Sequence, residues 1–85
     1  MDWPEWWTWE LAFTGHVEAR MEERGFSELE LRGMLESATA FRASGAPGRW
    51  LIETRHRDSE WAVIVEPDAV DRILVVVTAY PVSTS

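Results

Sequence analysis

The sequence predicts an α+β domain in which two N-terminal helices pack on a three-stranded antiparallel sheet, with a fourth strand permitted near the N-terminus. Residues 16–24 are good helix formers followed by a glycine, and residues 27–38 carry a capping signal and one apolar stripe. After residue 48, three alternating or apolar runs separated by short turns predict a β-meander. A chain of 85 residues with 46% hydrophobic residues supplies one core.

The first predicted helix has an unusual arrangement of charge. It runs from His16 to Arg24, with Thr14 as its N-cap and Gly25 as its C-terminal stop. Arg20 and Arg24 fall inside the apolar arc of this helix, and His16 lies at the edge of that arc. Because an unpaired guanidinium facing a core is destabilising, both arginines are expected to be at least half buried and hydrogen-bonded to acceptors from the strands.

The second predicted helix is interpreted as scaffold. Ser27 and Glu30 have the spacing of a capping box. Its apolar residues follow at helical spacing and form one stripe: Leu31, Met34, Leu35 and Ala38. Together with the strands, this stripe predicts a buried core that includes Leu31, Leu35, Ile52, Val63 and Val65.

The three predicted strands span Arg49–Arg57, Glu60–Glu66 and Arg72–Tyr80. Alternation in the first strand predicts one face with Trp50, Ile52, Thr54 and His56, and another with Leu51, Glu53, Arg55 and Arg57. Asp58 and Ser59 predict the tight turn into the second strand. The third strand is continuously apolar in its middle, which is typical of a central strand buried on both faces.

A tryptophan-rich arm is predicted over residues 1–12, ahead of a single domain over residues 13–82 and a frayed tail over residues 83–85. Four of the six tryptophans lie in the arm: Trp3, Trp6, Trp7 and Trp9. In one interpretation, these indoles cover an edge or end of the core. In the other, they form a partner-binding strip, because tryptophan anchors are enriched at interfaces.

The composition limits the classes of partner. With 8 basic and 15 acidic residues the net charge is −7, which counts against sequence-independent binding to phosphate backbones. The absence of cysteine excludes disulfides and zinc–thiolate sites, and no histidine pair has metal-ligand spacing, so that no metal or cofactor is predicted. No apolar run approaches the roughly 20 residues of a membrane helix. We therefore expect a cytoplasmic protein without a membrane partner.

Six residues form the candidate catalytic set: His16, Arg20, Arg24, Arg55, His56 and Tyr80. Such a set suits metal-independent RNA cleavage. A histidine or glutamate would take the proton of the 2′-hydroxyl, arginines would stabilise the phosphorane charge, and a second histidine or a tyrosine would protonate the leaving oxygen. The structural alternative is that His16 caps its helix while the two helical arginines pair with Glu53 or Glu66.

The chain also resembles a bacterial family of small domains of unknown function over about residues 13–82. The resemblance rests on the segments Gly15–Ser27, Trp61–Asp68 and Val75–Tyr80. Its signature is a histidine, an arginine and an Arg-Gly pair before a capped helix, here His16, Arg20, Arg24 and Gly25. That family is similar in fold to the RelE, ParE and BrnT toxins, whose wider group includes barnase-like ribonucleases.

The resemblance implies a RelE-like fold and a toxin-like or toxin-derived domain, acting as a metal-independent endoribonuclease of a toxin–antitoxin system. RNA and a cognate antitoxin are then the expected partners. His16, Arg20 and Arg24 match the family signature, and Tyr80 corresponds to the tyrosine near a RelE-type C-terminus. The competing hypothesis is a non-catalytic protein-interaction module on the same fold, which uses the tryptophan arm or the acidic surface.

Overall fold

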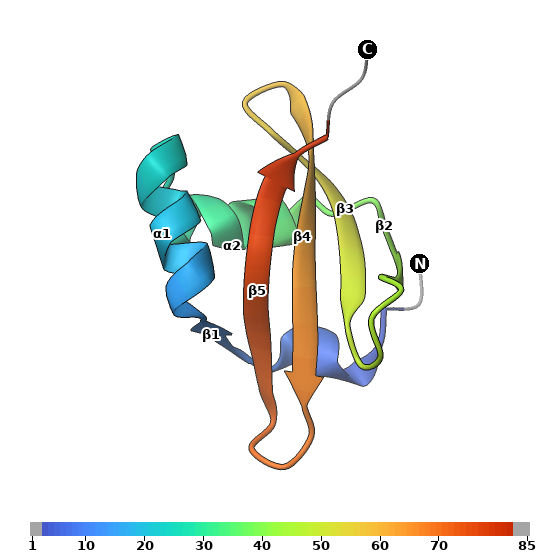
Figure 1. Ribbon diagram of the computed structural model, residues 1–85. Coiled ribbons are helices and arrows are strands. Elements are labelled where there is room, and N and C mark those ends of the chain that lie inside the picture. The colour runs from blue at the N-terminus through green and yellow to red at the C-terminus, as the bar shows by residue number, and fades with distance from the viewer. Residues whose placement is uncertain (1–2, 83–85) are drawn as a thin grey trace.

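The computed structural model describes residues 3–82 as two layers, a five-stranded sheet and two helices on one of its faces (Figure 1). The elements follow in the order η1 (Glu5–Thr8), β1 (Glu10–Phe13), α1 (Gly15–Arg24), α2 (Glu28–Glu36), β2 (Ala40–Ala43), β3 (Trp50–His56), β4 (Ser59–Asp68) and β5 (Ile73–Pro81). The predicted frayed tail, residues 83–85, lies outside the described residues.

The sheet is mixed, so the prediction of a RelE-like sheet with three or four antiparallel strands is wrong. Its strand order is β1-β5-β4-β3-β2. The pairs β2–β3, β3–β4 and β4–β5 are antiparallel, as the short turns predict, whereas β1 pairs with β5 in parallel. The fold is therefore α+β, with two strands more than the meander and one parallel pair at an edge.

Neither additional strand has a strong signal in the sequence. The four residues of β2 include two alanines and an arginine but no β-branched residue, which is a weak strand pattern. The alternation of Leu11 and Phe13 does permit β1, but no short turn joins β1 to β5, so local sequence does not specify a parallel pair. β1 also crosses the expected arm–domain boundary at residue 12.

Both helices form where their capping residues predict. In α1, the Thr14 hydroxyl accepts a hydrogen bond from the backbone N–H of Val17 at 3.1 Å. Gly25 ends this helix with a φ of 68°, a left-handed conformation that glycine adopts without strain. The capping box of α2 is complete, since Ser27 and Glu30 exchange hydrogen bonds between side chain and backbone.

The core between the two layers contains the residues that the sequence predicts. All five core residues named from the sequence are buried: Leu31, Leu35, Ile52, Val63 and Val65. α1 packs against β5 and α2 against β3. The buried Thr54 hydroxyl of β3 donates a hydrogen bond to the carbonyl of Met34, which ties the last turn of α2 to the sheet.

The β3–β4 hairpin turns one residue earlier than predicted. His56 pairs with Ser59, so the turn consists of Arg57 and Asp58, whose φ values of 51° and 63° are both positive, as a type I′ turn requires. Arg57 therefore does not lie on the sheet face where strand alternation placed it. Its guanidinium donates instead to the carbonyl of Gly25 at 3.0 Å, on the helix side.

Truncation of the α2 stripe tests this core. Leu31 has no exposed surface, so Leu31→Ala should lower the free energy of unfolding by about 2–5 kcal/mol through lost burial and a cavity. The matched control is Leu29→Ala on the same helix, which should change it by less than about 0.5 kcal/mol because Leu29 is 80% exposed. Equal losses in urea denaturation would contradict the assigned helix face.

Candidate functional site

The three candidate residues on α1 do not meet acceptors from the sheet. His16 is exposed in the first turn of the helix. Arg20 donates to the Glu23 carboxylate at 2.9 Å within its own helix. Arg24 is exposed, and its guanidinium carbon lies 6.0 Å from the centre of the Trp61 indole. The expectation that both arginines bond to strand acceptors is therefore wrong.

The structural alternative for these residues is also wrong. Thr14, rather than His16, caps α1. On the sheet, Glu53 is 4.0 Å from Arg42, and Glu66 accepts from Arg49 at 3.1 Å. Both glutamates thus pair with arginines from the strand region, because they lie on the side of the sheet that α1 does not cover.

Arg55 and Tyr80 lie on the sheet face opposite the helices. Arg55 pairs in register with Glu60, and Tyr80 pairs with Ala62. These positions alternate with Trp61, which faces the core, so their side chains project the other way. The sheet itself separates Arg55 and Tyr80 from the candidate residues of α1.

His56 lies on the helix side but is enclosed. Its side chain is only 9% exposed, and its ring contacts Phe26 and the indole of Trp61 at centroid distances of 5.7 and 5.3 Å. The buried Nε2 atom lies 3.6 Å from Oε2 of Glu30 and makes no hydrogen bond within the described residues. A packed imidazole of this kind joins helix to hairpin and offers little surface to a phosphodiester.

Four ionisable side chains lie together in a group that we call the hairpin cluster. It comprises Arg24, Glu30, His56 and Arg57, packed around Phe26 and Trp61. Glu30 is its centre, because one carboxylate oxygen accepts from the backbone N–H of Ser27 at 3.1 Å and the other from Arg57 at 3.0 Å. The hydrogen bond from Ser27 is the main cause that lowers the pKa of Glu30, and Arg57 adds to it.

The sequence predicted Glu30 as a cap but missed its role as a partner of the hairpin. Arg57 was placed on the wrong face of the sheet, so its contact with Glu30 was not expected. The missing signal was the turn itself, since a two-residue turn at Arg57–Asp58 takes Arg57 out of strand alternation.

The two histidines lie toward opposite ends of α1. His16 is in the first turn, whereas Arg57, which neighbours His56, bonds Gly25 at the far end. At 1.5 Å per residue, the separation of nine positions from His16 to Gly25 corresponds to about 13 Å. A general acid and a general base must both come within hydrogen-bond reach of one substrate. The structure therefore does not bring the two histidines together at one site.

The tryptophan arm packs against the core through a stack of aromatic rings. Trp3 stacks on Trp7 with ring centroids 4.3 Å apart, and Trp6 lies 5.8 Å from Trp50 of β3. Phe41 of β2 contacts Trp3, Trp6 and Trp50, and these rings all remain partly exposed. The arm thus covers one end of the core, as the first interpretation predicted, while presenting aromatic surface to solvent.

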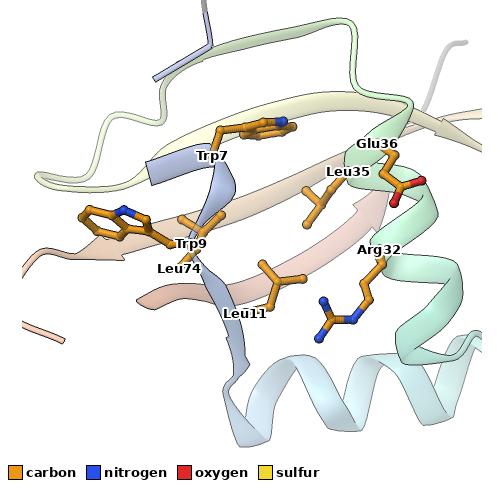
Figure 2. Close-up of a pocket in the computed structure, with 7 residues that line it drawn as sticks. All are labelled: Trp7, Trp9, Leu11, Arg32, Leu35, Glu36 and Leu74. Carbon is orange, nitrogen blue, oxygen red and sulfur yellow. The ribbon is translucent and has the colours of Figure 1, made fainter. Parts of the chain in front are cut away.

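A pocket of about 180 Å³ opens between the arm and α2 (Figure 2). It is lined by Trp7, Trp9, Leu11, Arg32, Leu35, Glu36 and Leu74. Trp9 does not belong to the stack of Trp3 and Trp7, and in Figure 2 it borders the pocket beside Leu74 of β5. Figure 2 also shows the α2 residues opposite the two indoles, with the Arg32 guanidinium extending toward Leu11.

The rim of this pocket carries excess negative charge. Arg32 donates to the Glu28 carboxylate at 3.0 Å, one turn earlier on α2. Glu36 follows one turn later and lines the pocket, whereas Glu28 does not. Because Arg32 is paired with Glu28, the Glu36 carboxylate is the charge at the pocket that no cation balances within residues 3–82. The sequence did not indicate the pocket, because it forms only when β1 pairs with β5 and places Trp9 and Leu11 beside Leu74.

Three further findings bear on the class of site. Among residues 3–82, no group of three or more His, Asp or Glu side chains is placed to hold a metal ion. Neither α1 nor α2 is long and apolar enough to cross a membrane. Comparisons with protein-family models, curated proteins and solved structures gave no match to the chain.

The hairpin cluster predicts a specific pH dependence of stability. Because the pKa of Glu30 is lowered below its ordinary value of 4.5, the ionised carboxylate stabilises the fold above that pH, and this contribution is lost as the pH falls through the lowered value. Glu30→Gln keeps an acceptor at the capping position but removes the charge. Wild type should therefore lose more stability than this variant on acidification.

The measurement is chemical denaturation of both proteins at a series of pH values from neutral to well below 4.5. The difference between their free energies of unfolding should be largest near neutral pH and should shrink in acid. A difference that stays constant across the series would show that the Glu30 charge does not stabilise the folded state.

Proposed function

We propose that the protein is a non-catalytic protein-interaction module whose partner inserts an apolar side chain into the pocket between the tryptophan arm and α2. The pocket is the observation that carries this proposal, because two partly exposed indoles line it together with three leucines. Buried anchors of protein interfaces fill such pockets, and tryptophan is enriched among the residues that dominate binding energy.

The size of the pocket favours a single side chain as its occupant. Sites for drug-sized ligands and cofactors have volumes of roughly 300–1,000 Å³. A volume of about 180 Å³ is smaller than that range. An apolar cavity of about 150 Å³ is large enough to take up benzene, which has the size of a phenylalanine ring. The pocket therefore suits one aromatic or large aliphatic side chain of a protein partner.

The charge around the pocket favours a basic partner. Arg32 at the pocket is paired with Glu28, whereas the Glu36 carboxylate of the lining has no cationic partner within residues 3–82. Opposite charge on the partner speeds encounter and disfavours acidic competitors. The partner segment that fits is therefore basic and carries one apolar anchor, and a cognate antitoxin with such a segment is one candidate.

The arrangement of the candidate catalytic residues supports a module over a ribonuclease. His16 and His56 lie toward opposite ends of α1, and Arg55 and Tyr80 lie on the far face of the sheet. The net charge of −7 also disfavours binding to a polyanion without a cationic partner. A toxin-derived origin is compatible with this proposal, since a toxin-like domain can retain its protein contact without catalysis.

A designed peptide tests the pocket directly. The probe is a short peptide of lysine, arginine and serine with one central phenylalanine, and its binding is measured by calorimetry. Trp9→Ala should weaken binding at least about tenfold, because it removes one wall of the pocket without removing a member of the Trp3–Trp7 stack. Replacing the peptide phenylalanine by alanine should have a similar effect.

The matched protein control is Leu29→Ala, an exposed residue of α2 that does not line the pocket. It should bind the peptide as wild type does. Absence of binding to wild type, or equal affinity of wild type and Trp9→Ala, would overturn the proposal. Equal binding of the phenylalanine and alanine peptides would show attraction by charge alone and would also overturn it.

A further inference from the structure

One edge of the sheet is open beside the pocket. β1 is the strand at this edge, and within residues 3–82 it pairs only with β5. The N–H of Thr14, just after β1, donates to the carbonyl of Val76 at 3.2 Å. In a parallel ladder every second residue of an edge strand bonds the neighbouring strand, so the backbone of Ala12 also faces β5. The N–H and C=O groups of Leu11 and Phe13 therefore point away from the sheet.

These outward-pointing backbone groups are available for pairing. Neither Leu11 nor Phe13 has a backbone hydrogen bond to any other residue of the described range 3–82. None of the four residues of β1 is buried. The strand also lacks proline and lysine, which commonly protect a sheet edge against pairing, and its one charged residue is Glu10 at the first position. The edge of β1 can therefore accept a further strand.

The pocket of the proposed function lies on the helix side of this same edge. The Leu11 side chain lines the pocket, while its backbone groups face the open edge. Figure 2 shows β1 along one side of the pocket and α2 along the other, with the Leu11 side chain between them. Alternate side chains of a strand project to the same face. A strand added beside β1 therefore directs every second side chain toward the helix side, where one of them can enter the pocket.

Unpaired carboxylates flank this edge on both faces of the sheet. Glu36 lies at the pocket on the helix side. Glu10 alternates with Leu11 along β1, so its exposed side chain projects to the opposite face. Neither carboxylate has a cationic partner within residues 3–82. An added strand that carries an apolar anchor among lysine and arginine residues would complement both the pocket and these charges.

Two other arrangements fit these observations less well. A second copy of this chain would bring another net charge of −7 to the contact, together with its own Glu10. Like charges brought together in this way oppose association. The opposite edge of the sheet is formed by β2, but no residue of β2 lines the pocket. A basic segment of another protein, paired with β1, is the occupant that the pocket and the charges favour.

We propose that the protein partner binds as an extended segment that adds a further strand to the sheet beside β1. Its main chain pairs with the free backbone groups of Leu11 and Phe13, and one of its alternate side chains fills the pocket. This inference rests on the proposed function, and it adds the conformation of the partner segment. Main-chain hydrogen bonds then supply affinity, whereas the pocket and the two carboxylates select the sequence.

Amide hydrogen exchange, measured by NMR on the unmodified protein, locates the added strand. The probe is the designed peptide of lysine, arginine and serine with one central phenylalanine. The amides of Leu11 and Phe13 should exchange rapidly in the free protein and at least about tenfold more slowly at saturating peptide, because each gains an acceptor. The amides of β2, at the other edge of the sheet, are the control and should keep their exchange rates.

Peptides methylated on backbone nitrogens test the main-chain pairing. Successive backbone N–H groups of a strand point to opposite sides, so one alternate set faces β1 and the other faces solvent. Methylation of one set should weaken binding at least about tenfold, whereas methylation of the other set should change it by less than about twofold. Each peptide is the matched control of the other, since both carry the same side chains.

The outcomes separate this inference from the proposed function. Absence of binding by the unmethylated peptide contradicts both. Binding that requires the phenylalanine but is affected equally by the two methylated sets, or that leaves the Leu11 and Phe13 amides in rapid exchange, contradicts strand addition alone. Slowed exchange at β2 in place of β1 contradicts it as well. Protection of the Leu11 and Phe13 amides in the free protein that rises with protein concentration would place a second copy at the edge and would also overturn the inference.

Discussion

Burial of the helix-facing side of β4 and β5 is the interaction on which the rest of the structure depends. Val63, Val65 and Val76 at its centre have no exposed surface. α1 and α2 have ten and nine residues, and helices this short are marginal in water without tertiary contacts. Both helices are therefore held by this one apolar surface. Because they lie on the same face, no helix among residues 3–82 covers the opposite face of the sheet.

Polar contacts position the helices on that surface. They are made by residue types that also occur in catalytic sites. The Thr54 hydroxyl bonds the end of α2, while Arg57 links the hairpin to Gly25 and Glu30 at the other end. His56 is packed between aromatic rings beside the same carboxylate. An ionisable side chain in a small domain can thus have a structural role. Whether it can act on a substrate depends on its exposure as much as on its residue type.

Local patterns in the sequence predicted the structural features that depend on residues close together in the chain. The caps at Thr14 and Ser27, the apolar stripe of α2 and the alternation of β3 all specify structure over a few residues, and each is confirmed. The parallel pairing of β1 with β5 depends on residues about 60 positions apart, so no local pattern specified it. The pocket depends on that pairing. The spacing of His16, Arg20 and Arg24 likewise indicated a helix face but not what lies opposite it.

We propose that this fold presents a binding surface and does not assemble a catalytic site. Cleavage of a mixed RNA pool by wild type and by His16→Ala, at equal concentration and with and without a chelator, tests this proposal most directly. We expect no cleavage by either protein under any of these conditions. Cleavage by wild type that persists with chelator and falls about 10²–10⁴-fold in the folded His16→Ala variant would contradict it, because that loss is typical of removing a general acid or base.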